Sequence, residues 1–504
     1  MKNLNFQGKQ LKSLESFNLD NTFAQLGPEL YQLKSPDPVS EPYLVDFNPE
    51  GARLIGLDPK EADRPEFVEY CAGNKLFPGS KPLAMAYSGH QFGVYNPRLG
   101  DGRGLLLGEV TNGDGHKWDI HLKGAGPTRF ARGFDGRATL RSSIREYLAG
   151  EALHGLKIPT TRSLAIVGIR ELIYRQTPEL AAVLVRISDS HIRFGSFELF
   201  HYTNDPGRVK ELADHVIQRH HPDIENEADK YQLLFRRVMT STVQLIARWQ
   251  AAGFVHGVMN TDNMCITGVT FDYGPYGFID HFDPRYTPNT SDSHGRYALG
   301  KQAEIGYWNL SKWGETLCGL VDPEDILEEM AQYQPMYNSF YRELMGQKLG
   351  LAVLDQEFAD LMGKLFELLF NNPVDYTNFF RGLSNYPEGN FSGLLHAFND
   401  QKEIKDWLDR YGKLIDREGS AFEERKDKMD AVNPKFLLRQ YLLQRAIDKA
   451  LKESDFSEIQ RLRVLLEDPF NDRPEIFKQY GIDPEFYASD TPDSQLGMQL
   501  SCSA

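Results

Sequence analysis

Hydrophobic positions in the first half of the chain follow the short, aliphatic-rich runs that are typical of strands. These runs predict strands at residues 104–110, 118–123, 164–167 and 181–187. The first two strands are joined by the turn dipeptides Asn112-Gly113 and Asp114-Gly115, which predict a β-hairpin. Between the two strand pairs, apolar residues recur near helical spacing and predict a helix over residues 137–156.

The pattern changes to helical spacing after about residue 200. Residues 227–250 predict an amphipathic helix that ends at Gly253, and residues 283–466 are predicted to be mostly helical. The fold class is therefore α+β, with a β-rich lobe and a helical lobe joined near residues 188–200. We expect four parts: an N-terminal extension packed on the core (1–95), the N-lobe (96–200), the helical C-lobe with the catalytic and metal-binding loops (201–486), and a loosely held C-terminal tail (487–504).

Composition and charge limit the classes of partner. The 504 residues carry a net charge of -15, which argues against nucleic acid as the main partner because phosphate backbones need a basic face. No apolar run approaches membrane-spanning length, and the N-terminus lacks the features of a secretory signal. The four cysteines are widely scattered, which fits a reducing compartment. We therefore expect a cytoplasmic protein with no membrane partner.

The segment from His256 to Asn263, followed by Asp272-Tyr273-Gly274, resembles the catalytic loop and the metal-binding turn of a protein kinase. In a kinase the proton-accepting aspartate lies five residues before the asparagine, and here that position is Val258. Asn263 and Asp272 offer the oxygen ligands that Mg²⁺ or Mn²⁺ prefers, although an Asx-turn in a surface loop is the alternative. We expect His256 to brace the loop.

An ordered series of phosphate-binding features precedes that loop. Gly100-Asp101-Gly102-Arg103-Gly104 opens a strand, and glycines let backbone amides approach phosphate oxygens. Lys123 ends the next strand and Glu146 lies on the following helix, in the order in which kinases place a phosphate-binding lysine and the glutamate that holds it. Each feature alone is more often a plain turn or a surface residue. The complete series predicts a bilobal kinase-like fold.

Four segments make the resemblance more specific: Tyr87 to Gly93, Leu122 to Thr128, His256 to Asn263, and Asp272 to Pro275. With them, the chain from about residue 10 onward resembles the selenoprotein O family. The resemblance implies a kinase-like protein adenylyltransferase that binds ATP in reversed orientation and transfers AMP to protein hydroxyls. It implies metal ligands at Asn263 and Asp272, a proton acceptor at Asp262 and a lysine partner at Glu146. The implied nucleotide-binding positions are Gly100, Gly102, Arg103, Lys123, Asp135, Gly136, Arg186, Arg193 and Asp272.

The residue types make a reversed nucleotide physically plausible. Arg103, Arg186 and Arg193 are placed where an ordinary kinase holds adenine with apolar side chains. Guanidinium groups prefer phosphate oxygens, which they grip in pairs. If the terminal phosphates occupy this region, the α-phosphate lies near the metal, and attack on it releases pyrophosphate and leaves AMP on the acceptor.

Asp262 offers a base in place of the missing aspartate. It adjoins Asn263, and successive loop residues can point in different directions, so that one holds metal while the other receives a proton. The alternative is that Asp262 only organises the metal ligands, because transfer of this kind depends mainly on positioning and electrostatics.

Cys502 resembles a sulfur counterpart of the selenocysteine that some family members carry near this terminus, or else is an incidental thiol. The loop from Ile279 to Ser293 contains no cysteine, so a disulfide between the tail and that loop is unavailable.

The expected function is transfer of AMP from ATP to Ser, Thr or Tyr hydroxyls of proteins, dependent on Mg²⁺ or Mn²⁺. Three alternatives remain at this point. The enzyme could transfer UMP from UTP, because nothing in the sequence reads the base. It could be an ordinary phosphotransferase with a displaced base. Because Val258 replaces the usual base, it could also be an inactive nucleotide-binding scaffold.

Overall fold

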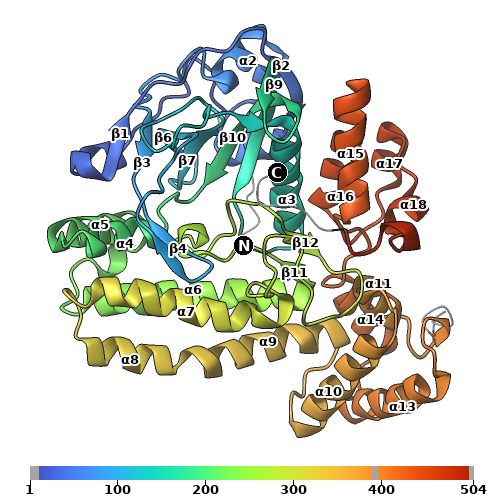
Figure 1. Cartoon of the computed structure of the whole chain (residues 1–504). Helices are drawn as coiled ribbons and strands as arrows, with labels where there is room; N and C mark the ends of the chain where they lie inside the picture. The colour runs from blue at the N-terminus through green and yellow to red at the C-terminus, as the bar shows by residue number, and fades with distance from the viewer. Residues whose placement is uncertain (1–10, 389–394, 499–504) are drawn as a thin grey trace.

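The computed structural model describes residues 11–388 and 395–498, which form a sheet-containing lobe above a larger helical lobe (Figure 1). The predicted α+β, two-lobed fold is confirmed. The central sheet is antiparallel, and its strands are ordered β1-β3-β6-β7-β10-β9-β2, with the short β8 paired to β10. These strands are β1 (Tyr31–Leu33), β2 (Tyr43–Phe47), β3 (Leu83–Met85), β6 (Gly104–Thr111), β7 (Lys117–Lys123), β8 (Ala138–Thr139), β9 (Arg162–Tyr174) and β10 (Pro178–Ser188).

The predicted local elements are present, with shifted ends. The expected hairpin is β6–β7, and the second strand pair is the longer hairpin β9–β10. The helix predicted at 137–156 is α3 (Leu140–Gly155), which Thr139 caps through its hydroxyl. The helix predicted at 227–250 is α6 (Lys230–Ala252), and Gly253 ends it in the left-handed conformation. These elements follow from local patterns, which explains why the sequence predicts them.

The N-terminal residues are part of the sheet. They supply β1, β2 and β3, while α1 (Pro49–Leu54) and α2 (Pro65–Ala72) lie against the outer face. The side chains of β6 alternate between the faces: Leu105 and Leu107 pack toward α2, and Leu106 packs toward α3 and the helical lobe. The N-terminal extension, which was expected to pack on the core, therefore also supplies strands of the sheet. The four-part division of the chain itself stays a prediction.

The helical lobe is built around α6, which runs beneath the sheet lobe beside α7 and α9 (Figure 1). A second group of helices, from α10 to α14, has its own hydrophobic core at the lower right of Figure 1. Helices α15 and α16 pack against α3. The helices after the hairpin β9–β10 are α4 (Phe194–Tyr202), α5 (Pro206–His220), α7 (Gln302–Leu317), α8 (Pro323–Ala331), α9 (Tyr333–Leu349), α10 (Gln356–Asn371), α11 (Tyr376–Leu383), α13 (Gln401–Glu418), α14 (Phe422–Asp430), α15 (Gln440–Glu453), α16 (Ser457–Glu467), α17 (Pro474–Tyr480) and α18 (Pro484–Ala488).

The start of the expected C-terminal tail is held in place rather than loose. Tyr487 is buried, and its hydroxyl donates to Glu458 over 2.7 Å. Thr491 is also buried and donates to Asp280 over 2.5 Å. The polar composition concealed these two anchoring contacts. Cys502 lies outside the described residues. Within those residues, no helix is long and apolar enough to cross a bilayer.

Candidate active site

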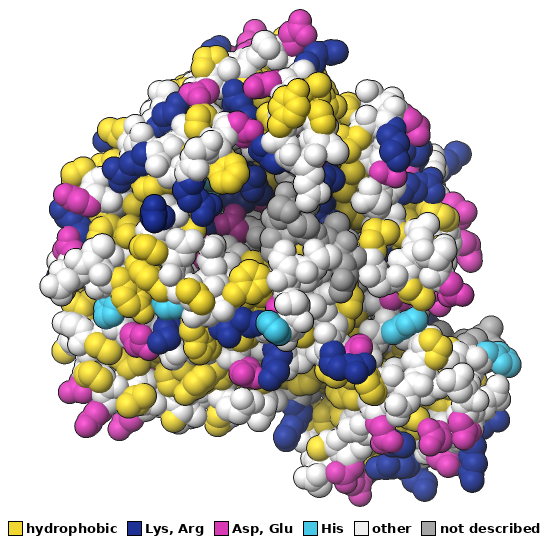
Figure 2. All heavy atoms as spheres, in the orientation of Figure 1, with side chains coloured by type: hydrophobic (Ala, Val, Ile, Leu, Met, Phe, Trp, Pro, Cys, Tyr) yellow, Lys and Arg dark blue, Asp and Glu magenta, His cyan; other side chains and the backbone are white. Residues whose placement is uncertain are grey.

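Two small two-stranded sheets lie where the lobes meet. One is the hairpin of β4 (Gly89–Gln91) and β5 (Val94–Asn96), and the other pairs β11 (Phe254–Val255) with β12 (Gly277–Phe278). The loop between β11 and β12 contains the kinase-like motifs. Figure 2 shows Lys and Arg side chains gathered around a hollow at this junction, with acidic side chains inside it. The ion pairs of Arg186 and Arg193 with Asp272 join this loop to the sheet lobe, so charged groups that the sequence singled out meet here.

Lys123, Glu146 and Arg186 form a buried charge cluster beneath the sheet. Lys123 ends β7, and Arg186 lies on the neighbouring strand β10. Both cations donate to the carboxylate of Glu146 on α3. Although burial opposes ionisation, the charges of Arg186 and Lys123 lower the pKa of Glu146 to about 2. The lysine–glutamate pair expected from the ordered series is therefore present and charged.

Asp272 is gripped by two arginines. Its two carboxylate oxygens accept from Arg186 and from Arg193, each over 2.6 Å. Its backbone has a φ of 55°, a left-handed conformation that aspartate adopts more readily than most residues. Burial opposes its charge, but Arg193 and Arg186 hold the pKa of Asp272 well below its usual range. Two of the three arginines predicted to bind phosphate thus contact the predicted metal ligand in this structure.

Arg193 links the metal-binding turn to the catalytic loop. Its guanidinium lies between the rings of Tyr87 and Phe271, at 4.1 and 4.6 Å from their centroids. It also donates to the backbone carbonyl of Asp262 over 2.8 Å. Only 1% of Arg193 is exposed, so almost none of its surface is open to solvent. The nucleotide contact predicted for Arg193 stays a prediction.

The glycine-rich loop is shaped by a close neighbour. Gly100 has a φ of 113°, and a Cβ there would lie 2.5 Å from the ring of Phe130. A Cβ at Gly102 would lie 2.8 Å from the carbonyl oxygen of Phe130. Packing alone therefore requires both glycines, whether or not phosphate approaches them. The side chain of Arg103 is exposed and forms no hydrogen bond or ion pair with the described residues.

Asp135 and Gly136 lie in the loop before β8. Arg175 clamps the carboxylate of Asp135 with two hydrogen bonds of 2.7 and 2.9 Å. Gly136 has a φ of 68°, and a Cβ there would overlap the backbone of Pro127. Neither residue bonds to the Glu146 cluster. The charge of Arg186 contributes to the lowered pKa of Arg103, and Arg103 in turn helps to lower the pKa of Asp135.

The catalytic loop is braced as the sequence predicted. The ring of His256 donates from Nε2 to the carbonyl of Phe271 over 3.1 Å, and its Nδ1 accepts from the amide of Val258. Burial lowers the pKa of His256, which keeps the ring neutral and suits one donor and one acceptor. Asn263 donates its amide to the carbonyl of Val258 over 2.9 Å. Its side-chain oxygen thus remains available for a cation.

The carboxylate of Asp262 is only partly hydrogen-bonded. Its Oδ1 is buried and has no hydrogen-bond partner within the described parts of the chain, while Oδ2 accepts only from Gln91, over 3.2 Å. Burial raises the pKa of Asp262 to about 7, against the attraction of Arg193. Such a carboxylate is poised to take up a proton near neutral pH. Val258, at the usual position of the base, offers only an apolar side chain.

The hairpin β4–β5 covers the catalytic loop, which spacing arguments did not anticipate. The amide of His90 donates to Thr261 Oγ1 over 2.7 Å, and the amide of Phe92 donates to the hydroxyl of Tyr297 over 2.8 Å. A Cβ at Gly89 would lie 2.8 Å from Oδ1 of Asp262. In the sequence, residues 87–93 served only as a family signature. Their polar residues flanked by glycines were the available signal, but nothing local connects them to a loop so distant in the chain.

Comparisons with known proteins agree with this geometry. The family described as "Protein adenylyltransferase SelO" matches residues 13–467. The chain belongs to the SelO family. It is 46% identical to the "Protein nucleotidyltransferase YdiU" of Myxococcus xanthus (strain DK1622), and the match covers 98% of this chain and 100% of that relative. The proteins of the same name from Thioalkalivibrio sulfidiphilus (strain HL-EbGR7) and Pseudomonas fluorescens (strain Pf0-1) are 46% and 44% identical over the same shares. The predicted resemblance is confirmed.

In this SelO-family chain, the candidate metal site has few protein ligands. Within residues 11–388 and 395–498, no three His, Cys, Asp or Glu side chains gather as a metal cage. Asn263 and Asp272 nevertheless fit a magnesium-type ion, which commonly takes one or two side-chain oxygens and completes its coordination with substrate phosphates and water.

Proposed function

We propose that this SelO-family protein transfers AMP from ATP to Ser, Thr or Tyr hydroxyls of proteins and releases pyrophosphate. Its family makes the chain a nucleotidyltransferase, and the substrate of such an enzyme is a nucleotide. The observation that carries the proposal is the changed position of the proton-accepting carboxylate. The position that an ordinary kinase gives to its base holds Val258, whereas the carboxylate of Asp262 lies beside the metal ligands with one oxygen unpaired.

The nucleotide is held, in this proposal, with its terminal phosphates on the arginines. Lys123, Arg103, Arg186 and Arg193 supply the positive charge, and Gly100, Gly102, Asp135 and Gly136 shape the surrounding loops. Arg186 and Arg193 now hold Asp272, and phosphate oxygens offer them a stronger set of charges. Binding of ATP thus exchanges one anion for another on the two arginines, and it frees Asp272 for the cation. Support for the reversed pose comes from arginines in the region that an ordinary kinase reserves for adenine.

Asn263 and Asp272 are the residues that would hold Mg²⁺ or Mn²⁺. When bound, such an ion neutralises charge on the phosphates and stabilises the leaving pyrophosphate. Asp262 takes the proton of the acceptor hydroxyl while the oxygen of that hydroxyl forms a bond to the α-phosphorus. The bond from that phosphorus to the oxygen bridging the α- and β-phosphates then breaks. Gln91 holds the second oxygen of Asp262 and so orients the base.

The products distinguish this proposal from ordinary phosphate transfer. We expect incubation with ATP, a divalent cation and a protein acceptor to yield pyrophosphate and an acceptor that is heavier by AMP. The measurement is chromatography of the nucleotides together with the intact mass of the acceptor. An acceptor heavier by a single phosphate, formed together with ADP, would favour the displaced-base kinase instead.

A further inference from the structure

A second charged cavity lies away from the nucleotide site, where several helices end. Its volume is about 130 Å³. It is bounded by the C-terminal ends of α3, α6 and α9, by the first turn of α11 and by residues 431–434. Three cationic side chains line it, Lys157, Arg248 and Lys348, and no Asp or Glu is among the described residues of its wall. The charged side chains of this lining are therefore all positive, and the helix C-termini beside them are the negative groups that face these cations.

Lys348 is the most unusual member of this lining. Only 6% of it is exposed, and its ammonium makes no hydrogen bond or ion pair with any described residue. Its closest electrostatic contacts are the faces of two rings on α11, Phe380 at 4.4 Å and Tyr376 at 5.5 Å. Burial lowers the pKa of Lys348 to about 7, and no carboxylate opposes that effect. The ammonium is therefore only partly protonated near neutral pH, and an anion bound beside it would favour its charged form.

The other two cations are also without acidic partners in the described chain. Arg248 is half-buried on α6 and forms no ion pair there. Lys157 is exposed after α3 and lies over the ring of Phe470 at 5.2 Å. No acidic side chain therefore neutralises either of them.

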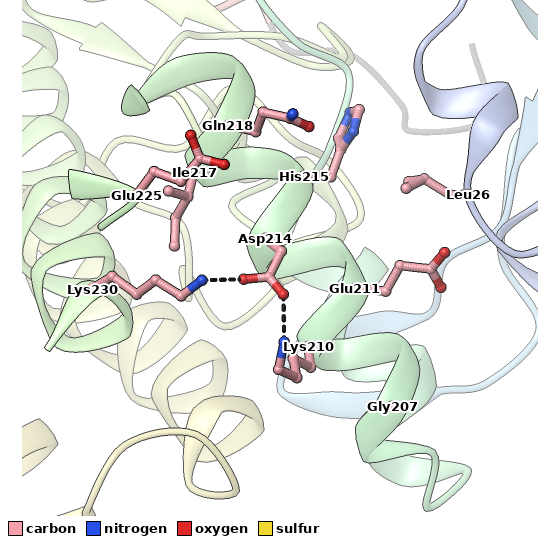
Figure 3. Close-up of a pocket in the computed structure, with 10 residues that line it drawn as sticks. All are labelled: Leu26, Gly207, Lys210, Glu211, Asp214, His215, Ile217, Gln218, Glu225 and Lys230. Atoms are coloured by element: carbon pink, nitrogen blue, oxygen red, sulfur yellow. Dashed lines mark hydrogen bonds and ion pairs between the residues drawn. The ribbon is translucent and has the colours of Figure 1, made fainter. Parts of the chain in front are cut away.

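A larger cavity beside α5, of about 570 Å³, shows the usual arrangement by contrast (Figure 3). There Asp214 lies between Lys210 and Lys230, with ion pairs of 2.6 and 2.8 Å. That lining contains carboxylates that pair with its lysines, whereas the described lining around Lys348 contains none.

We propose that the cavity around Lys348 binds a phosphate group. Lysine offers a point charge and arginine a planar fork, the pair of donors that phosphate oxygens favour. Thr377 adds a hydroxyl in the first turn of α11, at the positive end of that helix. The volume corresponds to roughly four waters, which fits a phosphate group but not a whole nucleotide. The group is either a free phosphate ion or the end of a monoester whose remainder stays outside.

A phosphate bound in this cavity would contact two helices that also lead to the candidate active site. Arg248 lies on α6, which leads into the catalytic loop, and Lys157 follows α3, which carries Glu146. A phosphate between them would link the C-terminal ends of α3 and α6, and the end of α6 is the one that leads into the catalytic loop. This connection is separate from the chemistry of AMP transfer and does not depend on it.

Equilibrium dialysis of the full-length protein against radiolabelled inorganic phosphate tests the proposal. Wild type should bind one more equivalent than Lys348→Met, whose affinity at this site should fall at least ten-fold. Any phosphate at the nucleotide site remains in both proteins and cancels in the difference. Competition by unlabelled glycerol 3-phosphate then identifies the source: stronger competition than by unlabelled phosphate indicates a monoester, and weaker competition indicates the free ion.

Two further variants keep the test decisive. Lys405→Met removes an exposed lysine on α13 and should bind phosphate as wild type does. Arg248→Gln should also weaken binding, and it carries the test if Lys348→Met does not fold. Phosphate should raise the melting temperature of wild type above its value in chloride at equal ionic strength, and raise it less in Lys348→Met. Equal phosphate binding by wild type, Lys348→Met and Arg248→Gln would overturn the proposal.

Discussion

At the scale of single residues, the account depends on Asp262. Asp262→Asn keeps the shape of the side chain and its contact with Gln91 but removes its basicity. General-base help typically contributes about a hundred- to ten-thousand-fold, so AMP transfer should slow by that factor. Nucleotide binding should stay within about two-fold of wild type, because the cations of the cluster are unchanged. Steady-state kinetics and calorimetric ATP binding give the two values.

A second substitution tests whether a carboxylate at residue 258, where a kinase has its base, can replace that of Asp262. Adding a carboxylate in Asp262→Asn/Val258→Asp should not restore transfer, because the proposed pose turns the attacked phosphorus away from residue 258. Rescue would mean that the acceptor approaches as in an ordinary kinase. A loss of metal-dependent ATP binding in Asp262→Asn alone would instead make Asp262 an organiser of the metal ligands.

Substitutions at two glycines of one loop test whether packing alone requires a glycine at residue 136. Gly136→Ala should destabilise the protein by roughly 3 kcal/mol or more, because a left-handed backbone and a clash with Pro127 act together. Gly133→Ala is the matched control in the same loop. Its φ is 84°, but no atom lies within 4 Å of the added Cβ, so we expect a cost of only about 1–2 kcal/mol. Urea unfolding measures both, and equal costs would show that the contact with Pro127 does not matter.

At the scale of elements, the hairpin β4–β5 is predicted to set the position of the base. Gln91→Ala removes the only hydrogen bond that the side chain of Asp262 makes within the described residues, so kcat should fall about ten-fold while the affinity for ATP is kept. Val94→Ala alters the same hairpin at a side chain that is 71% exposed and should leave kcat unchanged. Parallel kinetics decide the matter. A similar kcat for the two variants would show that the hairpin does not orient Asp262.

The elements also show what the sequence can and cannot predict. The hairpin β6–β7 and the helices α3 and α6 are predicted because turn dipeptides, periodicity and a terminal glycine are local signals. The strands β1 and β3 are three residues long and find their partners far along the chain, so no periodic pattern reveals them. The same limit applies to the site: the ordered series predicts the pair Lys123–Glu146, but not the contact of Gln91 with Asp262.

At the scale of the whole molecule, the two lobes bring opposite charges together before any nucleotide is bound. Lys123 and Arg186 pair with Glu146 inside the sheet lobe, and Arg186 and Arg193 reach Asp272 in the helical lobe. The order of motifs singled out Lys123, Glu146 and Asp272, and the family resemblance added Arg186 and Arg193 as nucleotide-binding residues. Their grip on Asp272 depends on how the lobes pack, and packing of this kind leaves no local pattern.

The central claim is that the α-phosphate is the one attacked, and labelled ATP tests it most directly. Two parallel incubations of the full-length protein with a protein acceptor and Mg²⁺ or Mn²⁺ differ only in the labelled phosphate of ATP. We expect label from the α-phosphate to enter the acceptor or the chain itself, and label from the γ-phosphate to stay in solution as pyrophosphate. Protein labelled from the γ-phosphate but not from the α-phosphate would contradict the account.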